Sequence, residues 1–216
     1  MNIKTRIADK SNFTVGRTKP IQYIVIHYTA NNGDTAQGNA NYFNSADRNA
    51  SAHYFVDENE IYQVVKDSDT ALHCGASKYI HAYCRNNNSI GIEMCSRKDS
   101  AGNYYIKEET IKNAIEITMF LMKKYGVPIG NILRHYDVTG KNCPEPFVRN
   151  ENLWQQFKEG LGDDEMVETS KIIINGKEVE VKRILKDGTN FIAIRDIANA
   201  LGYKISSNGN VAVLSK

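Results

Sequence analysis

The pattern of apolar and polar positions predicts strands and helices over most of the chain. Residues 21–28 and 89–95 are nearly continuous runs of apolar and β-branched residues, which is typical of strands covered on both faces. Residues 52–65 predict a hairpin that turns at the polar segment 57–60. Residues 132–135 predict a short final strand.

Three helices are expected beside these strands. Residues 108–125 show the clearest helical pattern, and glycine and proline end it. The spacing predicts that this helix buries Ile111, Ile115, Thr118, Met119 and Met122. Residues 35–46 are compatible with a helix that has Asp34 as its N-cap, and residues 150–161 carry an apolar face. The mixture of strands and helices predicts the α/β class.

The pattern changes after residue 162. A short acidic run follows, and we interpret residues 163–166 as a linker between a domain at 1–162 and a small module at 167–216.

In the small module, residues 171–182 form two β runs around Asn175-Gly176, which is a strong hairpin signal. Further turns are predicted at 187–188 and 208–209, and one helix at 194–201. These elements predict a small α+β C-terminal domain.

Composition and charge exclude several classes of protein. The 216 residues are 41% hydrophobic and 24% charged, as in a globular protein. No apolar run approaches the roughly 20 residues that span a bilayer, so we expect no membrane insertion. The first ten residues lack the apolar core of a signal peptide, which predicts synthesis in the cytoplasm. A net charge of +2 offers no footprint for nucleic acid.

The residues that can carry chemistry are few. His27 and His135 lie at the ends of predicted strands, where α/β folds commonly place ligand-binding residues, and Cys143 follows eight residues later. Two imidazoles and a thiolate would form a three-ligand zinc site with a fourth position open for water. On spacing alone, a single histidine at a strand end is more often a hydrogen-bonded core residue than a ligand. The other thiols, including Cys74 and Cys84, show no CxxC pairing, and a bridge between these two stays open.

Four separated segments, 23–30, 51–57, 89–93 and 134–144, resemble in order and spacing the zinc-dependent N-acetylmuramoyl-L-alanine amidases of type 2. This family includes bacterial cell-wall amidases and phage endolysins, and it shares its fold with animal peptidoglycan-recognition proteins. The resemblance covers about residues 1–160. It implies a central mixed β-sheet flanked by helices, with Zn²⁺ in a surface groove that holds a peptidoglycan stem peptide.

The resemblance also implies roles for individual residues. His27, His135 and Cys143 match the zinc ligands, and Lys141 matches a lysine that faces the developing oxyanion. The implied reaction is hydrolysis of the amide between N-acetylmuramic acid and L-alanine by zinc-activated water. Glu93 is the candidate for proton transfer, because a carboxylate inside an apolar strand has a raised pKa.

One departure from the family limits this transfer of roles. In one branch a catalytic tyrosine precedes the histidine of the second strand, whereas Ala52 precedes His53 here. Tyr54 would point to the opposite face of that strand, so proton transfer falls to Glu93. We expect His53 and His73 either to contact substrate from the groove wall or to be structural.

Two alternative functions remain open at this point. Cys143 could be the nucleophile of a cysteine amidase, although the adjacent Pro144 and the two histidines favour a ligand. The fold could also serve recognition of peptidoglycan without cleavage; such proteins have lost the zinc cysteine, which is present here.

The C-terminal module has no histidine and no cysteine. Residues 173–177, 191–198 and 201–203 resemble a small stalk-type repeat of extracellular bacterial proteins, including the N-terminal region of copper amine oxidases, but no copper or activity is transferred. We expect cell-wall binding or self-association. The layout predicts an enzyme of phage type that reaches the wall after the membrane is breached.

Overall fold

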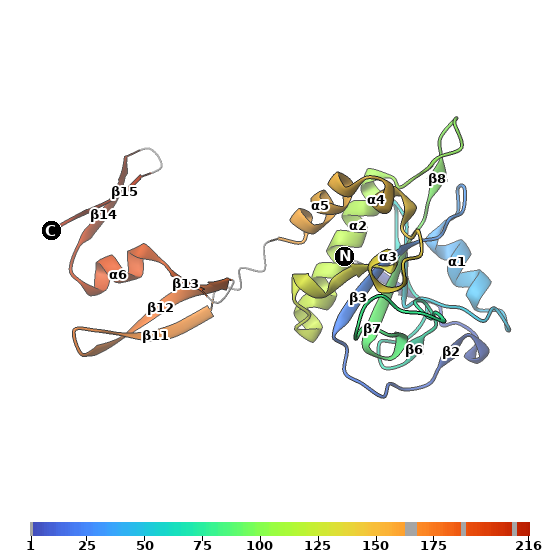
Figure 1. Cartoon of the computed structure of the whole chain (residues 1–216), viewed down its shortest axis with the longest axis horizontal. Helices are drawn as coiled ribbons and strands as arrows, with labels where there is room; N and C mark the ends of the chain where they lie inside the picture. The colour runs from blue at the N-terminus through green and yellow to red at the C-terminus, as the bar shows by residue number, and fades with distance from the viewer. Residues whose placement is uncertain (1, 163–167, 187–188, 209–210) are drawn as a thin grey trace. The chain divides into compact units, whose positions relative to one another are not determined.

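The computed structural model describes residues 2–162, 168–186, 189–208 and 211–216. The chain divides into two compact units, Met1–Gly162 and Asp163–Lys216 (Figure 1). Within the described ranges, no helix is both long enough and apolar enough to cross a membrane.

A six-stranded sheet forms the centre of the first unit. Its strand order is β1-β5-β4-β7-β3-β10, and every neighbouring pair is parallel except β4 and β5. The strands are β1 (Ile3–Thr5), β3 (Tyr23–Tyr28), β4 (Tyr54–Val56), β5 (Ile61–Gln63), β7 (Ser89–Met94) and β10 (Ile132–Arg134). The structure therefore confirms the α/β class and the mixed central sheet.

Five α-helices accompany this sheet in the described residues. They are α1 (Ala36–Phe43), α2 (Glu108–Tyr125), α3 (His135–Thr139), α4 (Glu145–Arg149) and α5 (Glu151–Gly160). Two small ladders join β2 (Phe13–Thr14) to β6 (Thr70–Ala71) and β8 (Arg97–Lys98) to β9 (Tyr104–Tyr105). Single 3-10 turns occur at Lys10–Asn12, Asn86–Asn88 and Ile129–Asn131.

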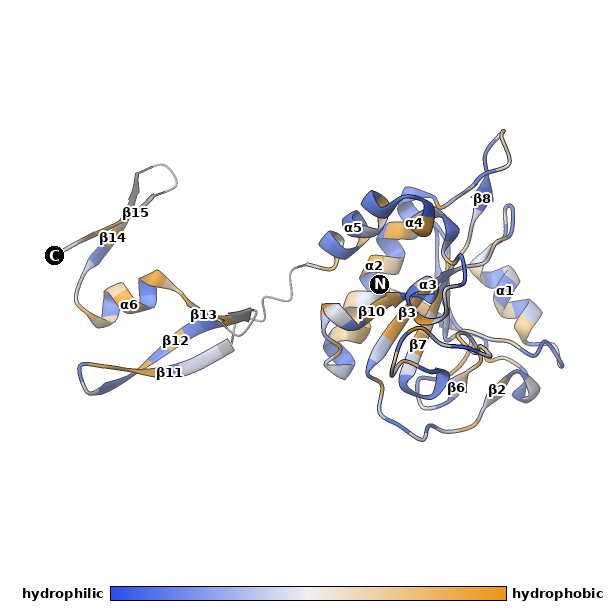
Figure 2. Cartoon of the chain, viewed as in Figure 1, coloured by the Kyte–Doolittle hydropathy of each residue, from blue (hydrophilic) through white to orange (hydrophobic). Residues whose placement is uncertain are grey.

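The two faces of the sheet carry different kinds of residue. Successive side chains of a strand point to opposite faces, so one strand can supply apolar residues to one face and polar residues to the other. On one face, apolar residues pack with α2, α4 and α5 into the main core, which includes Ile24, Ile26, Ile90, Ile92, Met94, Ile117, Leu121, Phe147, Trp154 and Phe157. Figure 2 shows the apolar colouring concentrated on β3 and β7. The other face of these two strands carries His27 and Glu93.

The predicted bounds of α2 are confirmed, but the predicted buried face is partly wrong. The buried residues are Thr110, Ala114, Ile117, Thr118 and Leu121, while Met119 is 45% exposed. Ile111, Ile115 and Met122 pack at the edge of the core. Apolar residues cover much of this helix's circumference, so their spacing alone did not decide which stripe meets the sheet.

Two predicted element ends also differ from the structure. The N-cap of α1 is Thr35, whose side chain accepts a hydrogen bond from the Gly38 N–H, and the predicted cap Asp34 was wrong. The Asp34 carboxylate instead accepts a hydrogen bond from Asn39 Nδ2 at 2.6 Å. Strand β10 ends at Arg134, so His135 is the first residue of α3 and not the last of the strand.

The second unit contains a three-stranded antiparallel sheet of β11 (Glu168–Ile174), β12 (Lys177–Lys186) and β13 (Thr189–Ile192). Helix α6 (Ile194–Ala200) follows, and then the paired strands β14 (Lys204–Asn208) and β15 (Val211–Ser215). Asn175 and Gly176 both have positive φ, which confirms the hairpin turn predicted there. The predicted linker 163–166 and the turns at 187–188 and 208–209 involve residues outside the described ranges.

Candidate active site

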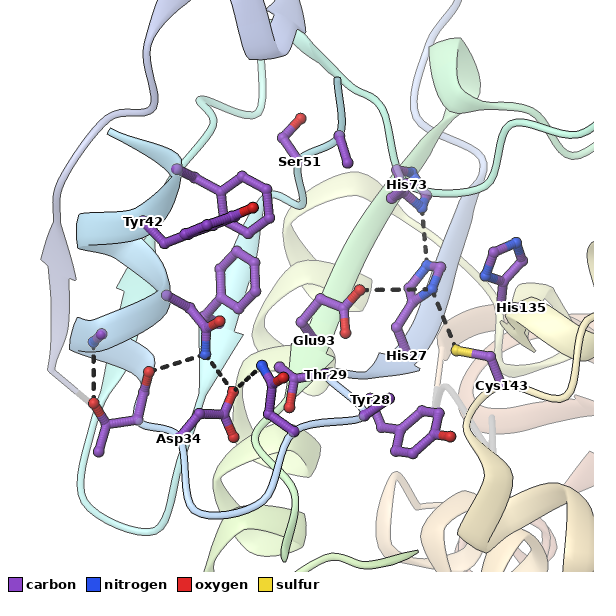
Figure 3. Close-up of a pocket in the computed structure, with 18 of the residues that line it drawn as sticks. His27, Tyr28, Thr29, Asp34, Tyr42, Ser51, His73, Glu93, His135 and Cys143 are labelled. Carbon is purple, nitrogen blue, oxygen red and sulfur yellow. Dashed lines mark hydrogen bonds and ion pairs between the residues drawn. The ribbon is translucent and has the colours of Figure 1, made fainter. Parts of the chain in front are cut away.

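Two of the candidate residues are held by the central sheet. In the register of the parallel strands β3 and β7, His27 is paired with Glu93. Both side chains therefore point to the face opposite α2. His27 Nδ1 lies 4.0 Å from Glu93 Oε1 (Figure 3).

The other two candidate ligands are His135, the first residue of α3, and Cys143, in the loop that follows α3. Strand β10 pairs with β3, so His135, which follows β10 directly, lies beside His27, with 4.7 Å between the ring centroids. The Tyr136 N–H donates to the Cys143 carbonyl at 2.8 Å and closes the loop onto α3. Cys143 Sγ consequently lies 3.7 Å from His27 Nδ1.

Arg134 anchors the segment that carries His135. Its guanidinium donates to the Asp137 carboxylate, to the Phe147 carbonyl at 3.2 Å and to Glu151 Oε2 at 2.6 Å. Only 8% of Arg134 is exposed. These bonds connect the start of α3 to α4 and α5, and they hold His135 against the sheet.

The three predicted ligands form a group that could hold a metal ion. One ligand atom from each of His27, His135 and Cys143 lies within 4.8 Å of the others, and all three residues are buried. His135 Nδ1 is buried and has no hydrogen-bond partner among the described residues. A ring nitrogen that has no hydrogen-bond partner can offer its lone pair to a metal ion.

The protonation states of the two histidines also suit a metal. Burial lowers the pKa of His27 well below its usual value and that of His135 to about 4, so both rings are neutral at pH 7 and offer lone pairs. Burial, followed by the charge of Glu93, raises the pKa of the Cys143 thiol to about 12 in the metal-free protein, so this thiol would release its proton when a metal binds. Two neutral imidazoles and one sulfur are a donor set that fits zinc.

Glu93 has the environment of a proton-transfer group. Burial raises the pKa of its carboxyl to about 8, although Lys141 acts in the opposite direction. Its Oε2 is buried and has no hydrogen-bond partner within the described residues. In the described part of the chain, no lysine or arginine forms an ion pair with Glu93, so its environment is not that of a carboxylate held in a structural salt bridge.

A pocket of about 850 Å³ opens over these residues. Lys141 is exposed at its edge, and its charge contributes to the lowered pKa of His27 and of His135. Sequence reasoning missed the remaining wall, which α1 and the loop before it provide with Asn31, Asp34, Asn39, Tyr42 and Phe43. The polar Asn39 and the adjacent aromatic pair in α1 were the available signals.

The two histidines that we expected at the groove wall, His53 and His73, differ in their position relative to the pocket. His73 lines the pocket, and its Nδ1 lies 3.0 Å from His27 Nε2. His53 is fully buried behind it, accepts the Gly91 N–H at Nδ1, and has Nε2 against Arg17. His53 is not among the residues that line the pocket, so the expected substrate contact does not fit its position.

Comparison with known proteins agrees with this geometry. The profile of the family described as N-acetylmuramoyl-L-alanine amidase matches residues 17–146, which is more than half of the chain. The chain belongs to this amidase family. The matched residues include the three candidate ligands, Glu93 and Lys141, and they exclude the C-terminal unit. The match confirms the resemblance seen in the sequence.

Individual members of the amidase family are similar over the same unit. A probable N-acetylmuramoyl-L-alanine amidase of Bacillus licheniformis is 42% identical over 146 residues, which are 64% of this chain and 40% of the relative. The amidase BlyA of Bacillus subtilis (strain 168) is 36% identical over 151 residues, again 64% and 40%. The chain thus spans well under half the length of these relatives.

Solved structures show the same amidase fold. The catalytic domain of XlyA is 28% identical and superposes with a TM-score of 0.63, covering 75% of this chain and 100% of that domain. A structure described as a mutant endolysin from Bacillus subtilis is 29% identical, with a TM-score of 0.62 over 75% of this chain and 99% of the other.

Proposed function

We propose that this amidase hydrolyses the amide bond between N-acetylmuramic acid and L-alanine in bacterial peptidoglycan, with Zn²⁺ held by His27, His135 and Cys143. The observation that carries the proposal is the grouping of these three buried ligand atoms beside Glu93. The names of the relatives, which are amidases and endolysins, support the substrate class.

The chemistry required is activation of both water and the amide. When bound, zinc acts as a Lewis acid that polarises a carbonyl and makes water acidic enough to ionise near neutral pH. Glu93 accepts the proton of the attacking water and delivers it to the departing nitrogen. A carboxyl with a pKa of about 8 can both accept and release a proton near neutral pH, and its Oε2 has no competing partner in the part of the chain that the structure describes.

Lys141 completes the proposed machinery. Its ammonium lies at the edge of the pocket, close enough for its charge to lower the pKa of Glu93 and of both ligand histidines. A fixed positive charge stabilises the negative charge that develops on the carbonyl oxygen more than it stabilises the neutral ground state. Lys141 therefore acts on the rate of the reaction.

A thiol nucleophile is the less favoured chemistry for Cys143. A nucleophilic cysteine needs a lowered pKa or a basic neighbour, whereas burial raises the pKa of this thiol to about 12. Burial also lowers the pKa of the neighbouring His27, which makes that ring a weak base. A binding role without cleavage is disfavoured by the retained cysteine and by Glu93, whose Oε2 has no hydrogen-bond partner among the described residues.

We further propose that residues 167–216 bind the cell wall or associate with a second copy, and that the protein acts on the wall once the membrane is breached. Among the residues of the second unit whose side-chain exposure is described, Val181 and Ala198 are the buried apolar ones, while Ile173, Phe191, Ile194 and Leu201 are exposed. Such a surface suits contact with another partner. Comparing full-length protein with residues 1–162 in wall pull-down and light scattering tests both options.

The products released from purified cell walls test the reaction. New N-terminal alanine without new reducing sugar is expected, and new reducing sugar alone would contradict the assignment. Chelation should abolish release and added zinc should restore it. Loss of activity to thiol alkylation, with no effect of a chelator, would instead support the cysteine nucleophile.

A further inference from the structure

A chain of hydrogen bonds runs from His27 away from the pocket. His27 Nε2 lies 3.0 Å from His73 Nδ1, and His73 Nε2 lies 3.0 Å from Ser89 Oγ. Ser89 Oγ donates to the Arg85 carbonyl at 2.7 Å. His27 and Ser89 are almost completely buried and His73 is 9% exposed, so water does not compete for these bonds.

When both histidines are neutral, the carbonyl at the end determines the direction of every bond in this chain. A carbonyl oxygen can only accept, so the single hydroxyl hydrogen of Ser89 points to Arg85, and Ser89 Oγ must accept from His73. A neutral His73 then carries its proton on Nε2 and accepts at Nδ1. His27 therefore carries its proton on Nε2, and its Nδ1 has a free lone pair.

We propose that His73 is a positioning residue that fixes the tautomer and ring orientation of His27 for metal binding. The inference rests on the proposed zinc site. The free Nδ1 of His27 is the atom that faces Cys143 Sγ and Glu93 (Figure 3). The opposite direction of the chain would place a proton on Nδ1, and a protonated ring nitrogen cannot ligate a metal.

The surroundings of His73 hold its ring in place. A Cβ atom built on Gly91 would lie 2.6 Å from His73 Cγ, so the ring packs directly against the backbone of β7 where only glycine leaves room. The buried ring of His53 packs edge-on against it, with 5.7 Å between centroids. Asn86 Oδ1 accepts the N–H groups of His73 and Cys74 and holds the backbone there.

Nitrogen-15 NMR of metal-free, histidine-labelled full-length protein tests the direction of the chain. The expected result is a proton on Nε2 of both His27 and His73. Ser89→Ala removes the acceptor for His73, and we expect both His27 tautomers to be populated in that variant. A His27 proton on Nδ1 in the unmodified protein would overturn the proposal. This measurement needs no metal, so a protein that shows the expected tautomers but binds no zinc refutes the proposed function and not the hydrogen-bond chain.

Zinc affinity, measured by competition with a chromophoric chelator, tests the consequence. Loss of a partner that orients a ligand typically weakens metal binding by about 10- to 100-fold, and we expect this for His73→Ala. His73→Asn places an amide oxygen near the position of Nδ1 and should retain most of the affinity. His81→Asn is the matched control, since His81 does not line this pocket and accepts backbone N–H groups of its own loop.

Unchanged zinc affinity in folded His73→Ala, judged by circular dichroism, would overturn the proposal. If that variant does not fold, Ser89→Ala takes its place in the titration. A reduced affinity together with mixed His27 tautomers then supports the proposal, and an unchanged affinity refutes it.

Discussion

His27 and Glu93 occupy paired positions on the adjacent parallel strands β3 and β7, with 4.0 Å between Nδ1 and Oε1. Their separation is set by the sheet and not by a loop. A rigid element keeps the proposed ligand and the proposed proton-transfer group at a constant separation, which efficient catalysis at a metal site requires.

Replacement of Glu93 by glutamine should separate catalysis from metal binding. Glutamine has nearly the same shape but cannot accept the proton, so we expect turnover to fall about 10²- to 10⁴-fold. Zinc content, measured by atomic emission after dialysis, should stay at that of the unmodified protein. An active Glu93→Gln enzyme would assign the proton transfer to another group.

The raised pKa of Glu93 also predicts how stability depends on pH in the metal-free protein. The folded state holds this proton up to about pH 8, whereas the unfolded chain releases it near 4.5, the ordinary pKa of a glutamate side chain. Stability associated with this group is therefore fully present below about pH 4.5 and is lost as the pH rises through about 8, by about 1.4 kcal/mol per unit of pKa difference. Glu93→Gln should thus unfold at higher urea concentration than the unmodified protein at about pH 8.5, and the advantage should shrink at about pH 5. Equal midpoints at both pH values would contradict the raised pKa.

Removal of the Lys141 charge should affect the rate and spare the metal. Loss of one group that stabilises a developing oxyanion commonly lowers kcat by about 10²- to 10³-fold, and we expect Lys141→Met to behave in this way. Its zinc affinity should not decrease, because an ammonium repels a cation. Measuring kcat on wall fragments and zinc affinity on the same preparation checks both statements, and a weaker zinc site would show that Lys141 has a structural role.

Arg134 should contribute more to stability than a comparable surface arginine. Arg134→Met removes charged hydrogen bonds to Asp137, Glu151 and the Phe147 carbonyl in a buried setting, which predicts a loss of about 1.5–3 kcal/mol. The matched control is Arg149→Met, because the ion pair between Arg149 and Glu145 is more exposed and contributes at most about 1 kcal/mol. Urea unfolding gives both values, and equal losses would contradict the anchoring of α3.

Zinc should raise the unfolding temperature through the predicted ligands. A ligand that binds only the folded state stabilises it by about 2.7 kcal/mol at 100 times its Kd. Cys143→Ser exchanges a soft sulfur for a hydroxyl, and the thermal shift on adding zinc should largely disappear. Cys95→Ser is the control, since this buried cysteine is not part of the candidate metal group. A full zinc shift in Cys143→Ser would remove Cys143 from the ligand set.

The sequence by itself determined the main strands and helices and the identity of the chemical groups. The bounds of α2, the strands around His27 and Glu93, and the Asn175-Gly176 hairpin follow from patterns among near neighbours, since helix and strand periodicities act over a few residues. The resemblance over four segments also identified the candidate site residues from sequence alone. These residues are His27, Glu93, His135, Lys141 and Cys143.

Only the tertiary structure decided how these groups meet. It paired His27 with Glu93, placed His73 against His27 across 46 residues of sequence, and buried His53 behind both. The packing also determined which residues of α2 are buried, among them Ala114, Ile117 and Leu121. Strand register, the faces that helices present and side-chain hydrogen bonds depend on packing between segments far apart in the chain, and local sequence patterns contain no information about that packing.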